Sequence, residues 1–305
     1  MTNRSHSEAP PWTILKLLRW TTDYFKSHHI ENPRASAEIL LSHLLGTARI
    51  DLYVRYDQPL MESELASFKT LIKRRVRREP VAYIVGEKEF WSMGLRVTPA
   101  VLIPRPETEC LVEAALHRLD RDKTKRILDA GTGSGAVALA LNRERPGNTI
   151  IASDRSREAL AVARGNAIRH NAAESIAFFC GDWFEAIRPA VSNVDLIISN
   201  PPYIRTADLA GLQPEVRAYE PKGALDGGVD GLSAIRHLIH RSPRYLADGG
   251  YLLMEIGHDQ RTGVEALVRE CGAYSEVEFQ QDYSGLDRVA VLRKGRPGSA
   301  ADTGR

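Results

Sequence analysis

Asn200-Pro201-Pro202-Tyr203 is the stretch whose residue types most directly suggest chemistry, and it follows the apolar run Val194-Asp-Leu-Ile-Ile198. That run is typical of a buried strand in a parallel sheet. The side-chain oxygen of Asn200 and the carbonyl of Pro201 are acceptors that can hold both hydrogens of a planar –NH₂ group. Prolines fix φ and offer no competing N–H, and Tyr203 can pack on the face of the bound group. We therefore assign catalysis to Asn200, Pro201 and Tyr203 and substrate binding to all four residues, with either an amide or an adenine amine as the substrate group.

A glycine-rich stretch, Asp129-Ala-Gly-Thr-Gly-Ser-Gly135, lies between a predicted strand and a predicted helix. Glycines let the backbone turn sharply and approach a ligand, and the helix start directs free N–H groups and a positive dipole end towards it. Asp154 follows the next predicted strand about twenty residues on, where an acid that accepts ribose hydroxyls belongs. The pattern indicates an adenosine-containing cofactor but does not choose between NAD and S-adenosylmethionine. The cofactor residues predicted here are Gly131, Thr132, Gly133, Ser134, Gly135 and Asp154.

A second cofactor contact is predicted at Gly181-Asp-Trp-Phe184, which follows the strand expected over 176–180 and so lies on the same rim of the sheet. Asp182 can accept a hydrogen bond from an adenine amino group while the Trp183 ring lies against the base. For Phe184, a place in the hydrophobic core is an equally good interpretation.

Together, the glycine stretch and Asn200-Pro-Pro-Tyr203 favour methyl transfer to nitrogen. Holding both hydrogens of an amide or exocyclic amine draws the nitrogen lone pair out of conjugation and aligns it with a sulfonium methyl. The nitrogen can lose its proton after it has become cationic, so no strong base is required. A dehydrogenase would instead need a site for a hydride-accepting carbonyl, which favours S-adenosylmethionine over NAD. Asn200 then borders the cofactor as well as the substrate.

The elements that must position these residues alternate between helix and strand beyond Thr108. Such alternation predicts an α/β fold with a doubly wound, mostly parallel sheet and right-handed crossovers. Together with the methyl-transfer motifs, it leads us to expect a seven-stranded Rossmann-like methyltransferase sheet. The tight turn Asp282-Tyr-Ser-Gly-Leu-Asp287 predicts a C-terminal antiparallel hairpin. We expect helices over 108–119, 135–144, 156–170, 232–246 and 260–271, and strands over 126–129, 149–152, 176–180, 194–199, 250–256, 275–281 and 288–293.

The region before Thr108 has a different pattern. Apolar residues recur at helical spacing from Trp12 to about Pro80, which predicts a small helical domain. We expect this domain to recognise the substrate. Two apolar runs with Gly86 and Gly94 as turn residues then suggest a β-hairpin linker. The predicted domains are a helical domain (1–80), a linker (81–107) with strands over 82–85 and 95–97, a methyltransferase domain (108–294) and a disordered tail (295–305), the first ten residues also being disordered.

The composition is that of an ordinary globular protein: 43% of the 305 residues are hydrophobic, 26% are charged, and the formal net charge is +2. This excludes a fibrous or disordered chain and does not demand a polyanionic partner, although it leaves nucleic-acid binding open. Cys110, Cys180 and Cys271 form no C-x-x-C pair, and the nine histidines show no metal-binding pattern, so we expect neither disulfide nor metal. Without a signal peptide or an apolar run of membrane length, we expect a soluble cytoplasmic protein with no membrane partner and no stable nucleic-acid partner.

The glycine stretch and Asn200-Pro-Pro-Tyr203 resemble the two signature motifs of class I S-adenosylmethionine-dependent methyltransferases that act on amino nitrogens. Adenine-N6 DNA enzymes and protein-glutamine enzymes share both motifs. The chain from about residue 12 to 293 closely resembles one subfamily, the bacterial peptide chain release factor N5-glutamine methyltransferases. The further stretches that carry this resemblance are Phe90-Trp-Ser, Leu102-Ile-Pro-Arg-Pro-Glu-Thr-Glu109, Gly181-Asp-Trp-Phe184 and Asp282-Tyr-Ser-Gly-Leu-Asp-Arg288.

The resemblance implies that S-adenosyl-L-methionine donates a methyl group to the glutamine of the Gly-Gly-Gln loop in class I release factors. It assigns Gly131 through Gly135, Asp154 and Trp183 to the cofactor, and residues 200–203 to the glutamine amide. A sister family that methylates a ribosomal protein also has Asn-Pro-Pro-Tyr, but its linker is not expected to read Ile-Pro-Arg-Pro-Glu-Thr-Glu. An adenine-N6 nucleic-acid methyltransferase and a non-catalytic adenosine-sensing module stay open as alternatives.

Several other residues have a structural and a functional interpretation. Arg105 and Glu107 are favoured as parts of a stiff strand-to-helix junction, although their position between domains also suits the site. Phe90 and Trp91 serve either hairpin packing or a substrate-facing wall. The basic run 73–78 ends a helix, where a solvated face is favoured over contact with an acidic partner such as a release factor or ribosomal RNA.

Overall fold

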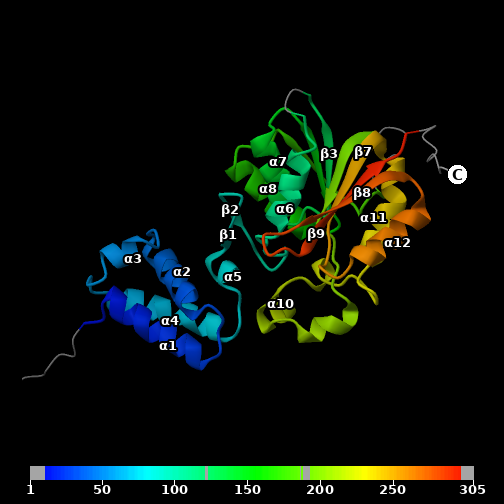
Figure 1. The fold of residues 1–305 in the computed structure, drawn as a ribbon. Helices are drawn as coiled ribbons and strands as arrows, with labels where there is room; N and C mark the ends of the chain where they lie inside the picture. The colour runs from blue at the N-terminus through cyan, green and yellow to red at the C-terminus, as the bar shows by residue number, and fades with distance from the viewer. Residues whose placement is uncertain (1–10, 121–122, 186, 188–192, 297–305) are drawn as a thin grey trace, which may run out of the picture. The chain divides into compact units, whose positions relative to one another are not determined.

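The computed structural model describes residues 11–120, 123–185, 187 and 193–296, and the chain forms two compact units (Figure 1). The helical unit comprises Met1–Gly86 and Pro214–Tyr219, and the sheet unit comprises Glu87–Gln213 and Glu220–Arg305. The predicted disorder of the two ends falls mostly on residues 1–10 and 297–305, which lie outside the described residues. Gly295, however, is held by a hydrogen bond from its N–H to the Ala273 carbonyl, so the predicted tail begins too early.

Short amphipathic helices build the helical unit. The side chain of Thr13 caps the first helix by accepting the Lys16 N–H, and Pro33 opens the second. Apolar residues at helical spacing meet in a core around Phe25, Leu40 and Phe68, which confirms the predicted helical N-terminal region. The helices of this unit are α1 (Ile14–Ser27), α2 (Pro33–Leu45), α3 (Asp51–Val54), α4 (Glu62–Val76), α5 (Val81–Val85) and α10 (Pro214–Tyr219).

The basic run at the end of α4 makes internal ion pairs. Arg75 is only 5% exposed and donates to the carboxylate of Glu215 in α10 at 2.9 Å, while Arg78 reaches the same carboxylate at 3.3 Å. Arg74 pairs with Glu79. The favoured prediction of a solvated basic face is therefore wrong for Arg75, because α10 comes from a part of the chain too distant for a local pattern to reveal.

A seven-stranded sheet with the order β5-β4-β3-β6-β7-β9-β8 forms the sheet unit. The first five strands in that order are parallel, and β9 runs antiparallel to β7 and β8, which confirms the predicted fold class. The strands are β3 (Arg126–Ala130), β4 (Thr149–Asp154), β5 (Ile176–Cys180), β6 (Val194–Ser199), β7 (Leu246–Glu255), β8 (Tyr274–Gln281) and β9 (Asp287–Lys294).

Helices cover both faces of the sheet (Figure 1). Side chains from α6, α7 and α8 pack in one hydrophobic cluster with one face, and side chains from α11 and α12 pack in a second cluster with the other. Along β3, Ile127 belongs to the first cluster and Leu128 to the second, as expected for a strand buried on both faces. These helices are α6 (Thr108–Leu116), α7 (Ala136–Glu144), α8 (Arg157–Arg169), α11 (Ser233–Arg241) and α12 (Arg261–Cys271).

The predicted hairpin exists, but its first strand was misplaced. The hairpin consists of β1 (Glu87–Phe90) and β2 (Met93–Arg96), while residues 82–85 belong to helix α5. Pro80 precedes that helix and Gly86, with φ of +78°, ends it in the left-handed conformation that suits glycine. Between β1 and β2, Trp91 and Ser92 have φ of +51° and +52°, the backbone that a tight hairpin turn requires.

The strand predicted over 250–256 begins earlier, at Leu246, and helix α11 ends earlier, at Arg241. Pro243 prevents the helix from continuing. The Gly249-Gly250 pair, which suggests a loop, instead forms an irregularity in the ladder, where Leu246 pairs with Val194 but Tyr251 already pairs with Leu196.

Candidate active site

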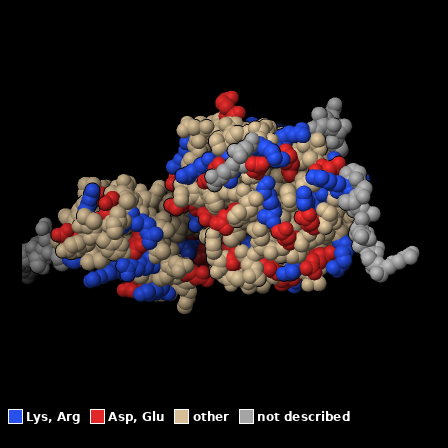
Figure 2. All heavy atoms as spheres, turned by 45° about the horizontal axis from the view of Figure 1, so that its top comes forward, with Lys and Arg blue, Asp and Glu red and all other residues tan. Residues whose placement is uncertain are grey.

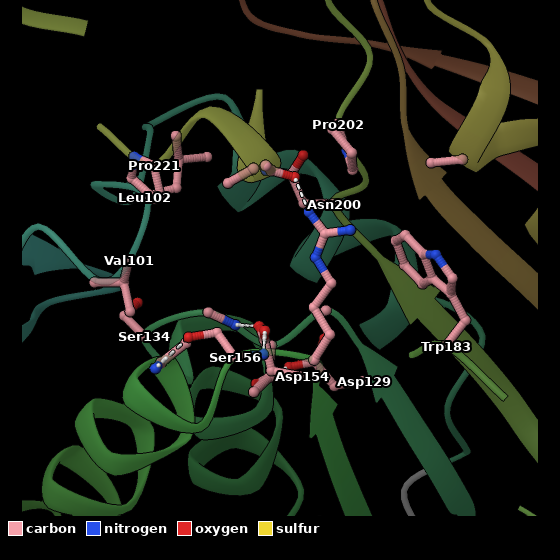
Figure 3. A pocket seen from close by; sticks show the side chains of 18 of the residues that line it. Val101, Leu102, Asp129, Ser134, Asp154, Ser156, Trp183, Asn200, Pro202 and Pro221 are labelled. Carbon is pink, nitrogen blue, oxygen red and sulfur yellow. Dashed lines mark hydrogen bonds between the residues drawn. The ribbon is translucent and has the colours of Figure 1, made fainter. Parts of the chain in front are cut away.

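A cavity of about 670 Å³ lies beside the carboxyl ends of β3, β4 and β6, where the strand order reverses. Ligands of open α/β sheets bind at this kind of position. Figure 3 shows Asp129, Asp154 and Ser156 on one side of the cavity, Asn200 on the opposite side, and Trp183 on a flank between them. The predicted site residues that line it are Gly131, Thr132, Gly133, Ser134, Asp154, Asp182, Trp183, Asn200 and Pro202; Gly135, Pro201 and Tyr203 do not.

The glycine loop is shaped by its own backbone. Gly131, Gly133 and Gly135 have φ of +81°, +55° and +84°, which residues with a Cβ rarely adopt. The N–H groups of Gly131 and Thr132 both donate to the Ser153 carbonyl, which ties the loop to β4. A Cβ on Gly135 would lie 3.3 Å from the Cβ of Ala163, so this glycine permits α7 and α8 to pack closely.

The Asp154 carboxylate is held in place by two backbone N–H groups. One oxygen accepts from Gly133 and the other from Ser156, each at 2.9 Å. Each carboxylate oxygen has two acceptor positions, so both oxygens can still accept hydroxyl groups from a ligand in the cavity.

Asp129 is the buried acid of the site, with 2% of its surface exposed. Burial raises its pKa to about 7, and a hydrogen bond from the Thr132 hydroxyl at 2.6 Å opposes that shift. The proton occupancy of Asp129 therefore changes near neutral pH, directly beneath the glycine loop.

An aromatic wall flanks the cavity. Trp183 is half-buried, has φ of +49°, and its ring lies 6.5 Å from that of His237 on α11, whose pKa is lowered by burial. Phe184 is only 1% exposed and stacks on Tyr245, so it is a core residue. Asp182 is exposed at the edge of the cavity.

The residues of the Asn-Pro-Pro-Tyr motif are oriented by side chains far away in the sequence. Asn200 donates from Nδ2 to the Thr108 hydroxyl at 3.1 Å, and Tyr203 donates to the Glu255 carboxylate at 3.1 Å. Within the described part of the chain, no donor reaches Asn200 Oδ1 or the Pro201 carbonyl, so both can accept hydrogen bonds from a substrate.

A loop that the sequence reasoning missed, Asp226-Gly-Gly-Val-Asp-Gly231, packs against this motif. A Cβ on Gly227 would lie 2.8 Å from Tyr203 Cα, and one on Gly231 would lie 2.6 Å from the Tyr203 carbonyl oxygen. The amide of Gln260 donates to the carbonyls of both Tyr203 and Gly231. Three glycines within five residues are a signal of close backbone approach that could have identified this loop.

The cavity also has lining residues that no motif suggested. Arg155 on the rim donates to the Gly223 carbonyl at 3.3 Å. The others outside the predicted set include Ala100, Val101, Leu102, Ser156, Pro221, Ala224, Ser233, Ala234 and His237.

Of the residues for which both a structural and a functional role were open, only Arg105 lines the cavity. Phe90 is buried, and Trp91 donates from its indole to Glu144 at 2.9 Å; neither lines the cavity, so both pack the hairpin. Arg105 lines the cavity while pairing with the buried Glu220, whereas Glu107 is exposed beside α6.

The described residues contain neither a cluster suited to a metal ion nor a helix suited to a membrane. Within residues 11–120, 123–185, 187 and 193–296, no group of three His, Cys, Asp or Glu side chains is arranged to hold a metal ion. In the same part of the chain, no helix has the length and apolar character needed to cross a membrane.

Comparison with known families gives two matches. The family model described as PrmC N-terminal domain matches residues 16–86, and the model described as Methyltransferase small domain matches residues 108–212. A release factor glutamine methyltransferase of Geobacter sulfurreducens is 44% identical over 93% of this chain and 98% of its own length. The enzyme of the same name from Coxiella burnetii is 44% identical over 87% of this chain and 93% of its own.

Solved structures share the fold at low sequence identity. The catalytic domain of hMettl16, in complex with the MAT2A 3'UTR hairpin 6, is 14% identical with a TM-score of 0.55, over 79% of this chain and 86% of that one. A methyltransferase from Pyrococcus furiosus is 16% identical with a TM-score of 0.52, over 73% and 99%. These likenesses support the methyltransferase fold of the sheet unit.

Proposed function

The chain belongs to the family of release factor glutamine methyltransferases, and from this premise we propose its reaction. It transfers a methyl group from S-adenosyl-L-methionine to the side-chain amide nitrogen, N5, of a glutamine. The substrate is the glutamine of the Gly-Gly-Gln motif in class I peptide chain release factors.

The walls of the cavity fit the proposed cofactor, which supplies an electrophilic sulfonium methyl when it is bound. Asp154 would accept the ribose hydroxyls with a carboxylate that Gly133 and Ser156 already hold in place. Trp183 would lie against the adenine and Asp182 would accept from its amino group. The left-handed glycines would let the loop approach the ligand closely, and the N–H groups at the start of α7 would be available to it as hydrogen-bond donors.

The orientation of Asn200 is the observation that carries the proposal. Its nitrogen is engaged by Thr108, so its oxygen and the Pro201 carbonyl are left to accept the two N–H groups of a substrate amide. With both acceptors in place, Asn200 and Pro201 would hold the amide nitrogen in the orientation that attack on the methyl group of the bound cofactor needs. Burial and the neighbouring Glu255 raise the pKa of Tyr203 above its ordinary value, so its phenol stays protonated and orients the substrate without acting as a base.

We propose that the helical unit recognises the protein substrate. Large hydrophobic side chains of this unit are exposed, as expected for a surface that a partner covers. They are Trp12, Trp20, Ile50, Tyr53, Val54, Tyr56 and Met61, against Ile168, Val229, Val277, Tyr283 and Leu286 in the described part of the sheet unit. Release factors work on cytoplasmic ribosomes, so we expect the reaction in the cytoplasm.

The mixed charge on one face of the sheet unit favours a protein substrate over a nucleic acid. Over the sheet unit, the face in Figure 2 shows Lys and Arg interspersed with Asp and Glu. A protein that follows a nucleic-acid backbone would carry a continuous basic stripe instead. We therefore expect no stable complex with nucleic acid.

Labelled S-adenosylmethionine tests the proposal when it is offered with four substrates in parallel. They are a class I release factor, the same factor with its Gly-Gly-Gln glutamine replaced by alanine, ribosomal protein, and duplex DNA. We expect label on the unaltered release factor alone. Label on the alanine variant, on the ribosomal protein alone or on DNA alone would overturn the proposed substrate.

A further inference from the structure

Glu255, the last residue of β7, is a buried carboxylate that bonds directly to Tyr203 at one end of the Asn-Pro-Pro-Tyr motif and is linked through Thr108 to Asn200 at the other. It is 1% exposed. Its Oε1 accepts from the Tyr203 hydroxyl at 3.1 Å and its Oε2 accepts from the Thr108 hydroxyl at 2.7 Å. The same Thr108 oxygen accepts from Asn200 Nδ2 at 3.1 Å. Four side chains from α6, β7 and the segment after β6 thus form one continuous chain of hydrogen bonds.

The direction of these hydrogen bonds follows from the chemistry of each group. An ionised carboxylate can only accept, so the single proton of Thr108 is committed to Glu255. The Thr108 oxygen can then only accept from Asn200, and the nitrogen of the Asn200 carboxamide is the one atom that can donate. The carboxamide nitrogen must therefore face Thr108, and Oδ1 must face the opposite way.

Several groups around Glu255 stabilise its ionised form against the effect of burial. Its pKa is raised overall, chiefly by burial and further by the charge of Glu107, while hydrogen bonds from Thr108 and Tyr203 and the guanidinium of Arg288 oppose the shift. Arg288 is fixed nearby, since it pairs with Asp282 at 3.1 Å and donates to the Ile256 carbonyl at 3.3 Å. Glu255 is thus a buried acceptor with two donors and a cation within its surroundings.

We propose that Thr108 and Glu255 are positioning residues that fix the carboxamide of Asn200 and thereby select an amide over a carboxylate as the substrate group. The two orientations of an Asn side chain have nearly the same shape, so packing alone cannot choose between them. With Oδ1 towards the substrate, Asn200 accepts from the –NH₂ of glutamine. With Nδ2 there instead, it would donate, which suits the carboxylate of glutamate. The inference rests on the proposed function, because it concerns how the same site recognises the glutamine of the substrate.

Three variants test the chain of hydrogen bonds from Glu255 through Thr108 to Asn200, which we call the relay. Thr108→Val keeps the shape of the side chain but removes its donor and acceptor, and Thr108→Ser keeps the hydroxyl. Glu255→Gln replaces an acceptor with a group that can donate to Thr108, which frees the Thr108 proton to reach Asn200. The matched controls are Thr262→Val and Glu270→Gln, whose parent residues are exposed on α12.

The measurements are kcat and KM with the release factor, the affinity for S-adenosylmethionine, and inhibition by a release factor whose Gly-Gly-Gln glutamine is replaced by glutamate. We expect Thr108→Val and Glu255→Gln to lower kcat by about 100-fold, as misplaced catalytic groups do, with cofactor affinity close to wild type. Thr108→Val should also lower the free energy of unfolding, because it removes a hydroxyl donor from the buried Glu255 carboxylate. The glutamate form should become a stronger inhibitor in both variants by about tenfold, the effect of one favourable hydrogen bond. Thr108→Ser should restore most of the turnover that Thr108→Val loses.

The results separate failure of the relay from failure of the proposed function. Wild-type enzyme that leaves every release factor unmethylated overturns the proposed function and the relay with it. Wild-type enzyme that methylates the factor overturns the relay alone if Thr108→Val keeps normal kcat and an unchanged response to the glutamate form. A Thr108→Ser variant as impaired as Thr108→Val would likewise reduce Thr108 to a packing role.

Discussion

Asn200 directly follows β6, and its side-chain nitrogen donates to Thr108 while its oxygen is left to accept. Replacing it with alanine removes one of the two acceptors for the substrate amide, so Asn200→Ala should lower kcat by about 100-fold or more, as loss of a positioned polar group at a reacting centre does. Affinity for S-adenosylmethionine should stay within about threefold of wild type, because the glycine loop and Asp154 are untouched. Single-turnover kinetics and calorimetric titration of the cofactor measure the two effects.

A matched control lies at the other end of the same strand. Asn193 is exposed and directly precedes β6, so Asn193→Ala should keep normal turnover. Turnover by Asn200→Ala at the level of the Asn193 control would contradict the proposal that Asn200 Oδ1 holds the substrate amide.

The carboxyl group of Asp129 should make stability depend on pH. Its folded pKa of about 7 lies above its ordinary value of 3.8, so the folded state holds this proton more tightly than the unfolded state. The resulting stabilisation is complete below the ordinary value and is lost as pH rises through about 7. Asp129→Asn has no such loss, so the free energy of unfolding of the variant relative to wild type should increase from about pH 4 to about pH 8. Urea unfolding of both proteins across this range measures it, and a constant difference would contradict the raised pKa.

What could be predicted among single residues depends on how far apart their partners lie in the sequence. The roles of Asn200 and the glycine loop can be predicted from the sequence because the residues of each motif are contiguous. The roles of Thr108 and Glu255 cannot be predicted in this way, since the hydrogen bond between them joins positions 147 residues apart. The sequence identifies Asp129 only as the start of the glycine loop, because a raised pKa follows from burial, which a local pattern does not specify.

The loop Asp226-Gly-Gly-Val-Asp-Gly231 shapes the site by letting its backbone approach Tyr203. A Cβ at position 231 would lie 2.6 Å from the Tyr203 carbonyl oxygen, so Gly231→Ala must displace either the loop or the motif. We expect kcat to fall by about 100-fold, the cost of a catalytic group displaced by about 1 Å. Steady-state kinetics with the release factor measure it.

Gly285 offers a control for the backbone cost of that substitution. Its φ of +77° is close to the +74° of Gly231, but a Cβ there would meet nothing within 4 Å. Both alanine variants are therefore destabilised by a left-handed backbone, and only Gly231→Ala also has a steric clash with Tyr203. If Gly285→Ala lost as much turnover as Gly231→Ala, the effect would belong to backbone strain and not to the approach to Tyr203.

Most helices and strands were predictable because their apolar periodicity agrees with their place in the sheet. The errors fall where a short segment suits two structures. Residues 82–85 are apolar, and Ile84 and Val85 are β-branched as is typical of a strand, yet Pro80 and Gly86 lie on either side of a single short helix. The Gly249-Gly250 pair resembles a loop, but pairing with β6 draws it into β7, which only the neighbouring strand could indicate.

The division of the whole molecule into two units predicts where the cofactor changes stability. Every residue that lines the cavity belongs to the sheet unit. Occupancy by S-adenosylhomocysteine, the product left by methyl transfer, at about 100 times its Kd should stabilise that unit by about 2.7 kcal/mol, by mass action alone. Helices α1 and α2 belong to the other unit and have their own core, so their opening should not gain this free energy.

Native-state hydrogen exchange separates the two units within one sample. Buried amides such as Leu252 in β7 should exchange about 100-fold more slowly with the ligand present, if they exchange through global opening of the sheet unit. Leu41 in α2 should exchange at the same rate with and without it. Equal slowing at both positions would mean that the helical unit opens only together with the sheet unit, and then the cofactor would also stabilise the surface that we propose receives the release factor.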